Sequence, residues 1–127
     1  MVKAGSLDER KLTQAIIETF KELAELLVAD AEGATKLIKV KVSKAKNQIQ
    51  AKSVAFTVAE SPLVKTAMFG SDANWGRILS AVGRDKTVED LNGLQIKLNG
   101  VPLVKNGYKD PKYSEKVASK AMKKKEI

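Results

Sequence analysis

Residues 60–83 read ESPLVKTAMFGSDANWGRILSAVG, and this stretch decides how the chain divides into elements. It contains the only tryptophan, Trp75, together with one of the three prolines and three of the eight glycines. Conformationally demanding residues gathered this densely indicate a shaped segment, and such segments serve a site or an interface more often than a core. Asn74 is a suitable N-cap, so the stretch predicts a short helix from Trp75 to Val82 that Gly83 ends.

On the amino-terminal side, the pair Ser61-Pro62 is interpreted as the end of a helix over about residues 45–60. The apolar stripe of this helix would consist of Ala51, Val54, Ala55 and Val58. Between the proline and Asn74, the segment Leu63–Phe69 is predicted as a strand or an extended loop.

Farther upstream, residues 36–43 read KLIKVKVS and alternate apolar with polar side chains, which predicts a strand with one buried face. An amphipathic helix is predicted before them, with Ser6 or Asp8 as its N-cap and Gly33 just past its end. Its apolar residues recur at helical spacing, at Leu12, Ile16, Phe20, Leu23 and Leu27. A stripe of this kind requires a packing partner.

On the carboxyl-terminal side, Leu94–Leu98 and Val101–Lys105 flank the pair Asn99-Gly100, which predicts a hairpin with a type I′ turn. The residues Leu94, Ile96 and Leu98 share one face of it. A last helix is predicted over about Tyr113–Lys125, with three residues facing inward: Val117, Ala121 and Met122.

These elements make an α+β fold with a mixed or antiparallel sheet and packed helices. Three strands are few for a free-standing sheet, so further strands or a partner subunit are expected. With 127 residues the chain fits one domain, which we place at residues 7–127.

Composition excludes several kinds of chemistry. The chain has neither cysteine nor histidine, so disulfides, thiolate or imidazole metal sites and a Ser-His-Asp triad cannot form. No cofactor and no metal site is expected. No apolar run approaches the roughly 18 residues that span a bilayer, and no secretory signal is visible, so a cytoplasmic location is expected. The net charge of +8 is compatible with a nucleic-acid partner, but also with a surface that is simply rich in lysine.

The segment Asp30–Lys36, DAEGATK, joins the first predicted helix to the first predicted strand. One interpretation is a helix end with solvated acidic side chains. The other places Glu32 at the mouth of a site, where its carboxylate would accept a charged hydrogen bond from an amine-bearing ligand. Residues 61–83 also allow a purely structural interpretation, with Trp75 in the core and Arg77 paired with Asp72.

Together, these two segments resemble the C-terminal, β-chain part of the bifunctional glutamate N-acetyltransferase/ornithine acetyltransferase family of arginine biosynthesis. The family's runs SPLVKTA and NWGRI are present here, and DAEGATK differs from its usual DGEGATK at Ala31. The resemblance covers about residues 23–127. Residues 1–6 match nothing in it and are set aside as a candidate cloning remnant. The fold that it implies is part of a layered α/β sandwich.

The resemblance implies that Glu32 contacts the amino-acid substrate. It also implies a set of residues that shape the pocket or the subunit contact, namely Gly33, Lys36, Asn74, Trp75 and Arg77. The departure at Ala31 would cost about 1 kcal/mol if that position requires a positive φ.

The chemistry that the resemblance implies is acetyl transfer from N-acetylornithine to glutamate. The nucleophile would be a threonine exposed by self-cleavage, with its own α-amine as the base. None of the six threonines lies in that cleavage context, so no catalytic residue is expected on this chain. The expected partners are the α chain and the Thr-bearing segment of the enzyme, in an oligomer.

Two other functions stay open. The same fold could serve as an assembly or binding module that has lost catalysis. Alternatively, the lysine-lined strand face and the basic cluster of Lys120 and Lys123–Lys125 could bind nucleic acid. The sequence disfavours this last function, because its few aromatic residues do not alternate with basic ones as a stacking platform would require.

Overall fold

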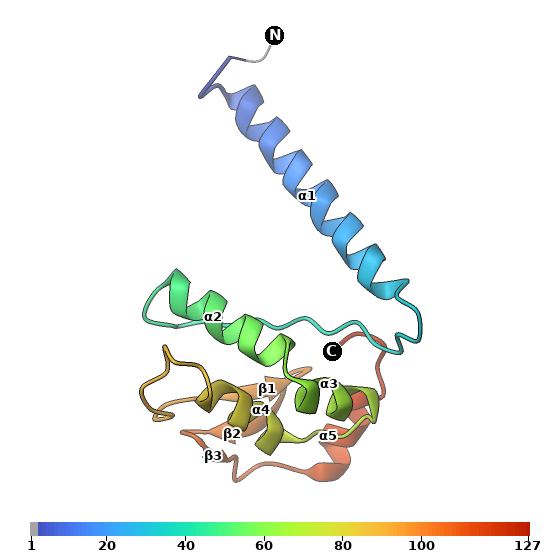
Figure 1. Cartoon of the computed structure of the whole chain (residues 1–127), viewed down its shortest axis with the longest axis vertical. Coiled ribbons are helices and arrows are strands. Elements are labelled where there is room, and N and C mark those ends of the chain that lie inside the picture. The colour runs from blue at the N-terminus through green and yellow to red at the C-terminus, as the bar shows by residue number, and fades with distance from the viewer. Residues whose placement is uncertain (1–2) are drawn as a thin grey trace. The chain divides into compact units, whose positions relative to one another are not determined.

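The computed structural model describes residues 3–127 (Figure 1), and these form two compact units, one ending at Leu37 and one running from Ile38 to Ile127. The described residues form an α+β fold, as predicted. Its elements in chain order are α1 (Leu7–Ala29), α2 (Gln48–Ala59), α3 (Pro62–Phe69), α4 (Trp75–Gly83), β1 (Ile96–Leu98), β2 (Val101–Lys105), β3 (Tyr108–Lys109) and α5 (Glu115–Met122).

The division into one domain at residues 7–127 stays a prediction. Of the six residues set aside before it, 1 and 2 lie outside the described residues. No helix within residues 3–127 is long and apolar enough to cross a bilayer.

The first unit consists of α1 and the loop that follows it. Ser6 is the N-cap, because its hydroxyl accepts a hydrogen bond from the Glu9 N–H at 3.1 Å, and the Glu9 carboxylate accepts one from the Gly5 N–H. This reciprocal arrangement approximates a capping box. The predicted apolar stripe is present, but no residue of α1 is buried. Within this first unit, the face that the sequence pattern marks for packing is therefore not covered.

The second unit begins with residues 38–43, where the predicted strand is wrong. No strand runs over residues 36–43, and the described strands all lie between Ile96 and Lys109. The period-two alternation is nonetheless real, since Ile38, Val40 and Val42 pack against the core while the residues between them stay exposed. Alternation reports which face is buried, whereas a strand requires a continued ladder of backbone pairs. Here the Lys39 N–H donates to the Ile127 carbonyl at 2.7 Å, but this contact is not extended into a strand over residues 36–43.

Helix α2 matches its prediction, and α3 does not. Asn47 caps α2, with its Oδ1 accepting from the Gln50 N–H at 2.9 Å, and the predicted stripe buries Val54 and Val58. Residues 63–69, predicted as strand or loop, belong to α3. The reason is that Ser61 acts as an N-cap, accepting from the Val64 N–H at 3.4 Å, with Pro62 in the first helical turn.

The sheet has three antiparallel strands in the order β1-β2-β3. The predicted type I′ turn is confirmed by positive φ values of 48° at Asn99 and 82° at Gly100. Strand β3 was not predicted from the sequence. A second pair of the same kind, Asn106-Gly107, turns the chain there, with φ values of 52° and 76°.

Helix α5 is shorter than the predicted Tyr113–Lys125, and its inward face differs. Ala118 and Met122 are fully buried, whereas Val117 is 52% exposed, so its predicted inward position is wrong. Residues four apart share a face of a helix, and Val117 lies one step to the side of that pair. The Asn99 side chain, in the turn between β1 and β2, holds the end of α5 and the residues that follow it. Its Nδ2 donates to the carbonyls of Ala121 at 3.2 Å and Glu126 at 3.1 Å.

The core of the second unit is contributed by α2, α3, α4, the sheet and α5, and its largest fully buried side chains are Leu103, Val104 and Met122. Helix α4 packs against both α2 and α3, while α5 packs against β1 and β2. Helices α2 and α4 carry several of the polar side chains described below, so the packing of this core fixes where those side chains lie.

Candidate functional site

The loop after α1 carries three of the predicted site residues. Asp30 is the C-cap, with its N–H donating to the Leu26 carbonyl at 2.9 Å. A turn follows, closed by the Ala34 N–H and the Ala31 carbonyl at 2.9 Å. The left-handed φ of this turn, +73°, belongs to Gly33 and not to Ala31, so the departure from the family pattern at Ala31 carries no backbone penalty.

Glu32 lies within this turn, next to Gly33. Its side chain is exposed, and so is Gly33, whereas Lys36 is half-buried farther along the loop. A Cβ placed on Gly33 would meet no atom within 4 Å. The glycine is therefore required for its backbone conformation and not for a close approach, and its effect is to hold a carboxylate on an open turn.

The other three predicted residues lie at the start of α4. Asn74 is the N-cap, as predicted, with its Oδ1 accepting from the Arg77 N–H at 3.0 Å and its Nδ2 donating to Asp72 Oδ2 at 3.0 Å. Trp75, the first residue of the helix, is half-buried and packs against the core. The side chain of Asn74 thus orients both the helix and the loop before it.

Arg77 connects α4 to α3. Its Nη1 donates to the Leu63 carbonyl at 3.2 Å and to Thr66 Oγ1 at 3.1 Å. The suggested pairing with Asp72 is not the contact that Arg77 makes, and the Asp72 carboxylate instead accepts from Asn74. One guanidinium therefore fixes the orientation of two short helices that no strand separates.

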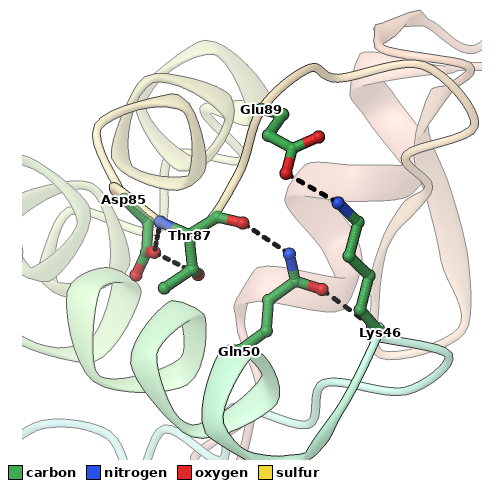
Figure 2. Close-up of polar contacts among 5 residues, drawn as sticks. All are labelled: Lys46, Gln50, Asp85, Thr87 and Glu89. Atoms are coloured by element: carbon green, nitrogen blue, oxygen red, sulfur yellow. Dashed lines mark hydrogen bonds and ion pairs between the residues drawn. The ribbon is translucent and has the colours of Figure 1, made fainter.

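Sequence reasoning missed a third polar group, centred on Asp85 (Figure 2). Asp85 is 4% exposed, yet both of its carboxylate oxygens accept hydrogen bonds. Figure 2 draws the contacts that come from Thr87. Oδ1 accepts from the Thr87 N–H at 2.8 Å and the Thr87 hydroxyl at 2.5 Å. Oδ2 accepts from the hydroxyls of Ser53 at 2.7 Å and Thr57 at 2.9 Å. The sequence Asp85-Lys86-Thr87 has the form of an Asx-turn, which was the available local signal.

These hydrogen bonds determine the protonation state of Asp85. Donation from the Thr87 hydroxyl, and then from the Ser53 hydroxyl, holds the pKa of the Asp85 carboxyl well below its usual range. The group is therefore an anion at neutral pH with every oxygen occupied. Such a carboxylate suits a structural connection between α2 and the residues after α4, and it has no remaining position for a substrate proton.

A further set of contacts continues from Thr87 to the start of α2. Figure 2 shows Gln50 between Thr87 and Lys46, with its Nε2 donating to the Thr87 carbonyl at 2.6 Å and its Oε1 accepting from the Lys46 N–H at 2.8 Å. Lys46 Nζ pairs with Glu89 Oε1 at 2.8 Å on the exposed side. Within residues 3–127, no cluster of three or more acidic side chains could hold a metal ion.

Comparison with known proteins identifies the class to which this fold and these motifs belong. Residues 2–127 match the sequence profile of the ArgJ family, and the chain belongs to that family. The match confirms the resemblance drawn from the two motifs and extends farther toward the amino end than the expected residues 23–127.

The particular relatives are named as arginine biosynthesis bifunctional proteins. The one from Agrobacterium fabrum is 42% identical over 99% of this chain, and the one from Psychrobacter arcticus is 48% identical over 91%. A crystal structure of the Bacillus halodurans protein superimposes with a TM-score of 0.89 at 34% identity, covering 96% of this chain and 57% of that one. The chain spans only 31% of the length of the Agrobacterium protein, so it corresponds to a segment of such enzymes.

Proposed function

We propose that this chain is the β-chain portion of an ornithine/glutamate N-acetyltransferase, which moves an acetyl group from N-acetylornithine to glutamate. The observation that carries the proposal is membership of the ArgJ family across residues 2–127, joined to an exposed Glu32 on the turn after α1. The names of the relatives place them in arginine biosynthesis, and the pathway enters here as part of the proposal. A cytoplasmic location belongs to it as well.

In this proposal Glu32 binds the amino group of the substrate. An exposed carboxylate is an acceptor for an ammonium group, and a charge-assisted hydrogen bond of this kind is stronger than one between neutral groups. Gly33 and Lys36 hold and flank the turn. The role of the other three residues is structural. The contacts of Asn74, Trp75 and Arg77 orient α3 and α4.

The nucleophilic threonine and the groups that stabilise the tetrahedral intermediate would reside on polypeptide outside this segment. This assignment rests on the family resemblance, because none of the six threonines lies in the self-cleavage context that the resemblance implies. The partners are therefore the α chain and the Thr-bearing segment, and the enzyme would work as an oligomer.

The test is substrate binding in a reconstituted complex. The chain is mixed with the remaining polypeptide of the Psychrobacter arcticus relative, and the Kd for N-acetylornithine is measured by calorimetry. Glu32→Gln should weaken binding by about 10-fold or more, as loss of a charged hydrogen bond predicts. Asp30→Asn, two residues away in the same loop, is the matched control and should leave Kd unchanged. Equal affinity of Glu32→Gln and the unaltered chain would remove the assignment of Glu32.

The second candidate is an assembly module without catalysis. The exposed apolar residues of α1 favour it, because a protein can keep a surface that binds a partner after it has lost its catalytic activity. A complex that forms but transfers no acetyl group from N-acetylornithine to glutamate would select this candidate. Nucleic-acid binding, the third possibility, would be selected by duplex affinity that falls steeply with added salt.

A further inference from the structure

Residues 38–43, at the start of the second unit, have the side-chain pattern of a strand but no strand beside them. Three apolar side chains pack against the core of this unit and the three between them are exposed, in the order Ile38, Lys39, Val40, Lys41, Val42 and Ser43. Within residues 3–127, the backbone of residues 40–43 makes no hydrogen bond. Backbone N–H and carbonyl groups are strong hydrogen-bonding groups, and a row of unpaired ones is a template for a further strand.

One edge of this segment already holds the first contact of a ladder. The Lys39 N–H donates to the Ile127 carbonyl at 2.7 Å, whereas the preceding carbonyl, that of Glu126, accepts from Asn99 Nδ2 at 3.1 Å. Successive carbonyls of a strand point to opposite sides, so Glu126 and Ile127 are placed as the first two residues of one. In Figure 1 these last residues run beside the start of the segment and in the same direction, so a ladder that continued from them would be parallel.

The side chains of the same two residues determine what the missing strand would look like. Glu126 Oε1 pairs with Lys39 Nζ at 3.3 Å on the exposed face, and Ile127 packs against the core. Because side chains of a strand alternate between its two faces, a strand that continues this line would place acidic residues over the lysine face and apolar residues over the core. Lys41 is the next lysine on that face, and within residues 3–127 it makes no ion pair.

The edge requires an extended backbone. A helix such as α1 has already used its N–H and carbonyl groups within itself, so it cannot supply the ladder. The backbone groups on the side of the Ile127 contact are those of Lys39, Lys41 and Ser43, and we call this side the Lys39 edge. The opposite edge has no such first contact with another strand.

We propose that the Lys39 edge accepts one parallel strand of alternating acidic and apolar residues, contributed by a segment that is not among these 127 residues. In strand addition, main-chain hydrogen bonds supply the affinity, and the alternate side chains supply the specificity. The inference goes beyond the proposed function and does not depend on it.

The experiment tethers such a strand to the chain. The full chain is extended after Ile127 by six residues that alternate glutamate and valine, beginning with glutamate, and amide hydrogen exchange is followed by NMR. The N–H groups of Lys41 and Ser43 should exchange at least about 10-fold more slowly than in the unextended chain, because the added strand supplies acceptors on their edge. The N–H groups of Val40 and Val42 point to the opposite edge, so they are the internal control and should be unchanged.

Two control extensions of the same length separate the causes. One alternates lysine and valine, which keeps the apolar positions but sets like charges over Lys39 and Lys41, and it should protect the two amides less. The other alternates glycine and serine, which is flexible and forms no strand, and it should give no protection.

Four results would overturn the proposal. The first is unchanged exchange at Lys41 and Ser43 in the glutamate–valine chain, and the second is equal protection by either control extension. The third is protection of Val40 and Val42 in place of Lys41 and Ser43, which would assign the strand to the opposite edge. The last is protection in the unextended chain that grows with its concentration, which would identify a second copy as the occupant.

These measurements are independent of the proposed function, because they involve neither substrate nor acetyl transfer. Failure of the strand to add would leave the acetyltransferase proposal standing. Failure of Glu32→Gln to weaken N-acetylornithine binding would likewise leave the Lys39 edge standing.

Discussion

The Ser53 hydroxyl donates a hydrogen bond to Asp85 Oδ2 at 2.7 Å, across 32 residues of sequence. This contact joins the middle of α2 to the residues just after α4. The two helices also pack directly against each other. Buried carboxylates are costly unless they are fully hydrogen-bonded, and Asp85 meets that condition through donors from two separate elements. The packing of α2 against α4 is therefore stable only while all four donors bind the Asp85 carboxylate.

Replacing Asp85 by asparagine should destabilise the second unit. The amide would present two N–H donors to hydroxyl and backbone N–H groups that now donate, which leaves buried donors without acceptors. The urea midpoint followed by circular dichroism should fall with an unchanged slope. Asp90→Asn is the control, since Asp90 is exposed and accepts only from the nearby Asn92 N–H in the contacts described, so its midpoint should not move.

The stability of the chain should depend on acid through the same residue. The folded state holds the pKa of Asp85 below its usual 3.8, so the folded chain binds fewer protons than the unfolded chain. The stabilisation is complete above the unfolded-state pKa and is lost as pH falls toward the lower folded-state pKa. Urea midpoints measured from about pH 6 to about pH 2 should fall less steeply in Asp85→Asn than in the unaltered chain. If the urea midpoints of the two chains fall in parallel with pH, other carboxylates determine the acid sensitivity of the fold.

The two glycines of the hairpin turns should respond differently to alanine. Both have positive φ, 82° at Gly100 and 76° at Gly107, but a Cβ on Gly107 would lie 2.8 Å from the Leu91 carbonyl oxygen, whereas one on Gly100 meets nothing. Gly100→Ala should cost about 1 kcal/mol for the strained backbone alone. Gly107→Ala should cost roughly 3 kcal/mol, because the steric clash adds to the strain. Equal unfolding free energies for the two variants would contradict the close approach at Leu91.

The inward face of α5 can be tested by paired truncations. Met122 is fully buried, so Met122→Ala should lower the free energy of unfolding by about 2–5 kcal/mol. Val117, at 52% exposure, should tolerate alanine within about 0.5 kcal/mol. A cost for Val117→Ala as large as that for Met122→Ala, measured by urea unfolding, would restore the predicted face, which included both residues.

The features that the sequence predicted well are those with local causes. Asn74 before Trp75 and the pair Asn99-Gly100 act through hydrogen bonds or φ values within a few residues, and both were confirmed. Pro62 has two valid local meanings, since a proline can follow one helix and begin the next, and only the first was recognised.

What the sequence could not predict depends on partners distant in the chain. The alternation at Ile38–Val42 correctly indicated a half-buried segment, but pairing into a sheet depends on a neighbour that no local pattern specifies. Asp85 resembles any loop aspartate until Ser53 and Thr57 are brought to it by α2. The role of Glu32 likewise stays a prediction, because its proposed partner is a substrate and not a residue of this chain.

The Asn99 side chain has a consequence for how the protein ages. Asparagine followed by glycine is the pair most prone to lose its amide nitrogen, and at this turn that nitrogen is the atom that donates to the carbonyls of Ala121 and Glu126. Deamidation would direct a carboxylate at two carbonyl oxygens, turning an attraction into a repulsion. Deamidation at this turn should therefore loosen the carboxyl-terminal tail, while the Asp85 contacts stay intact.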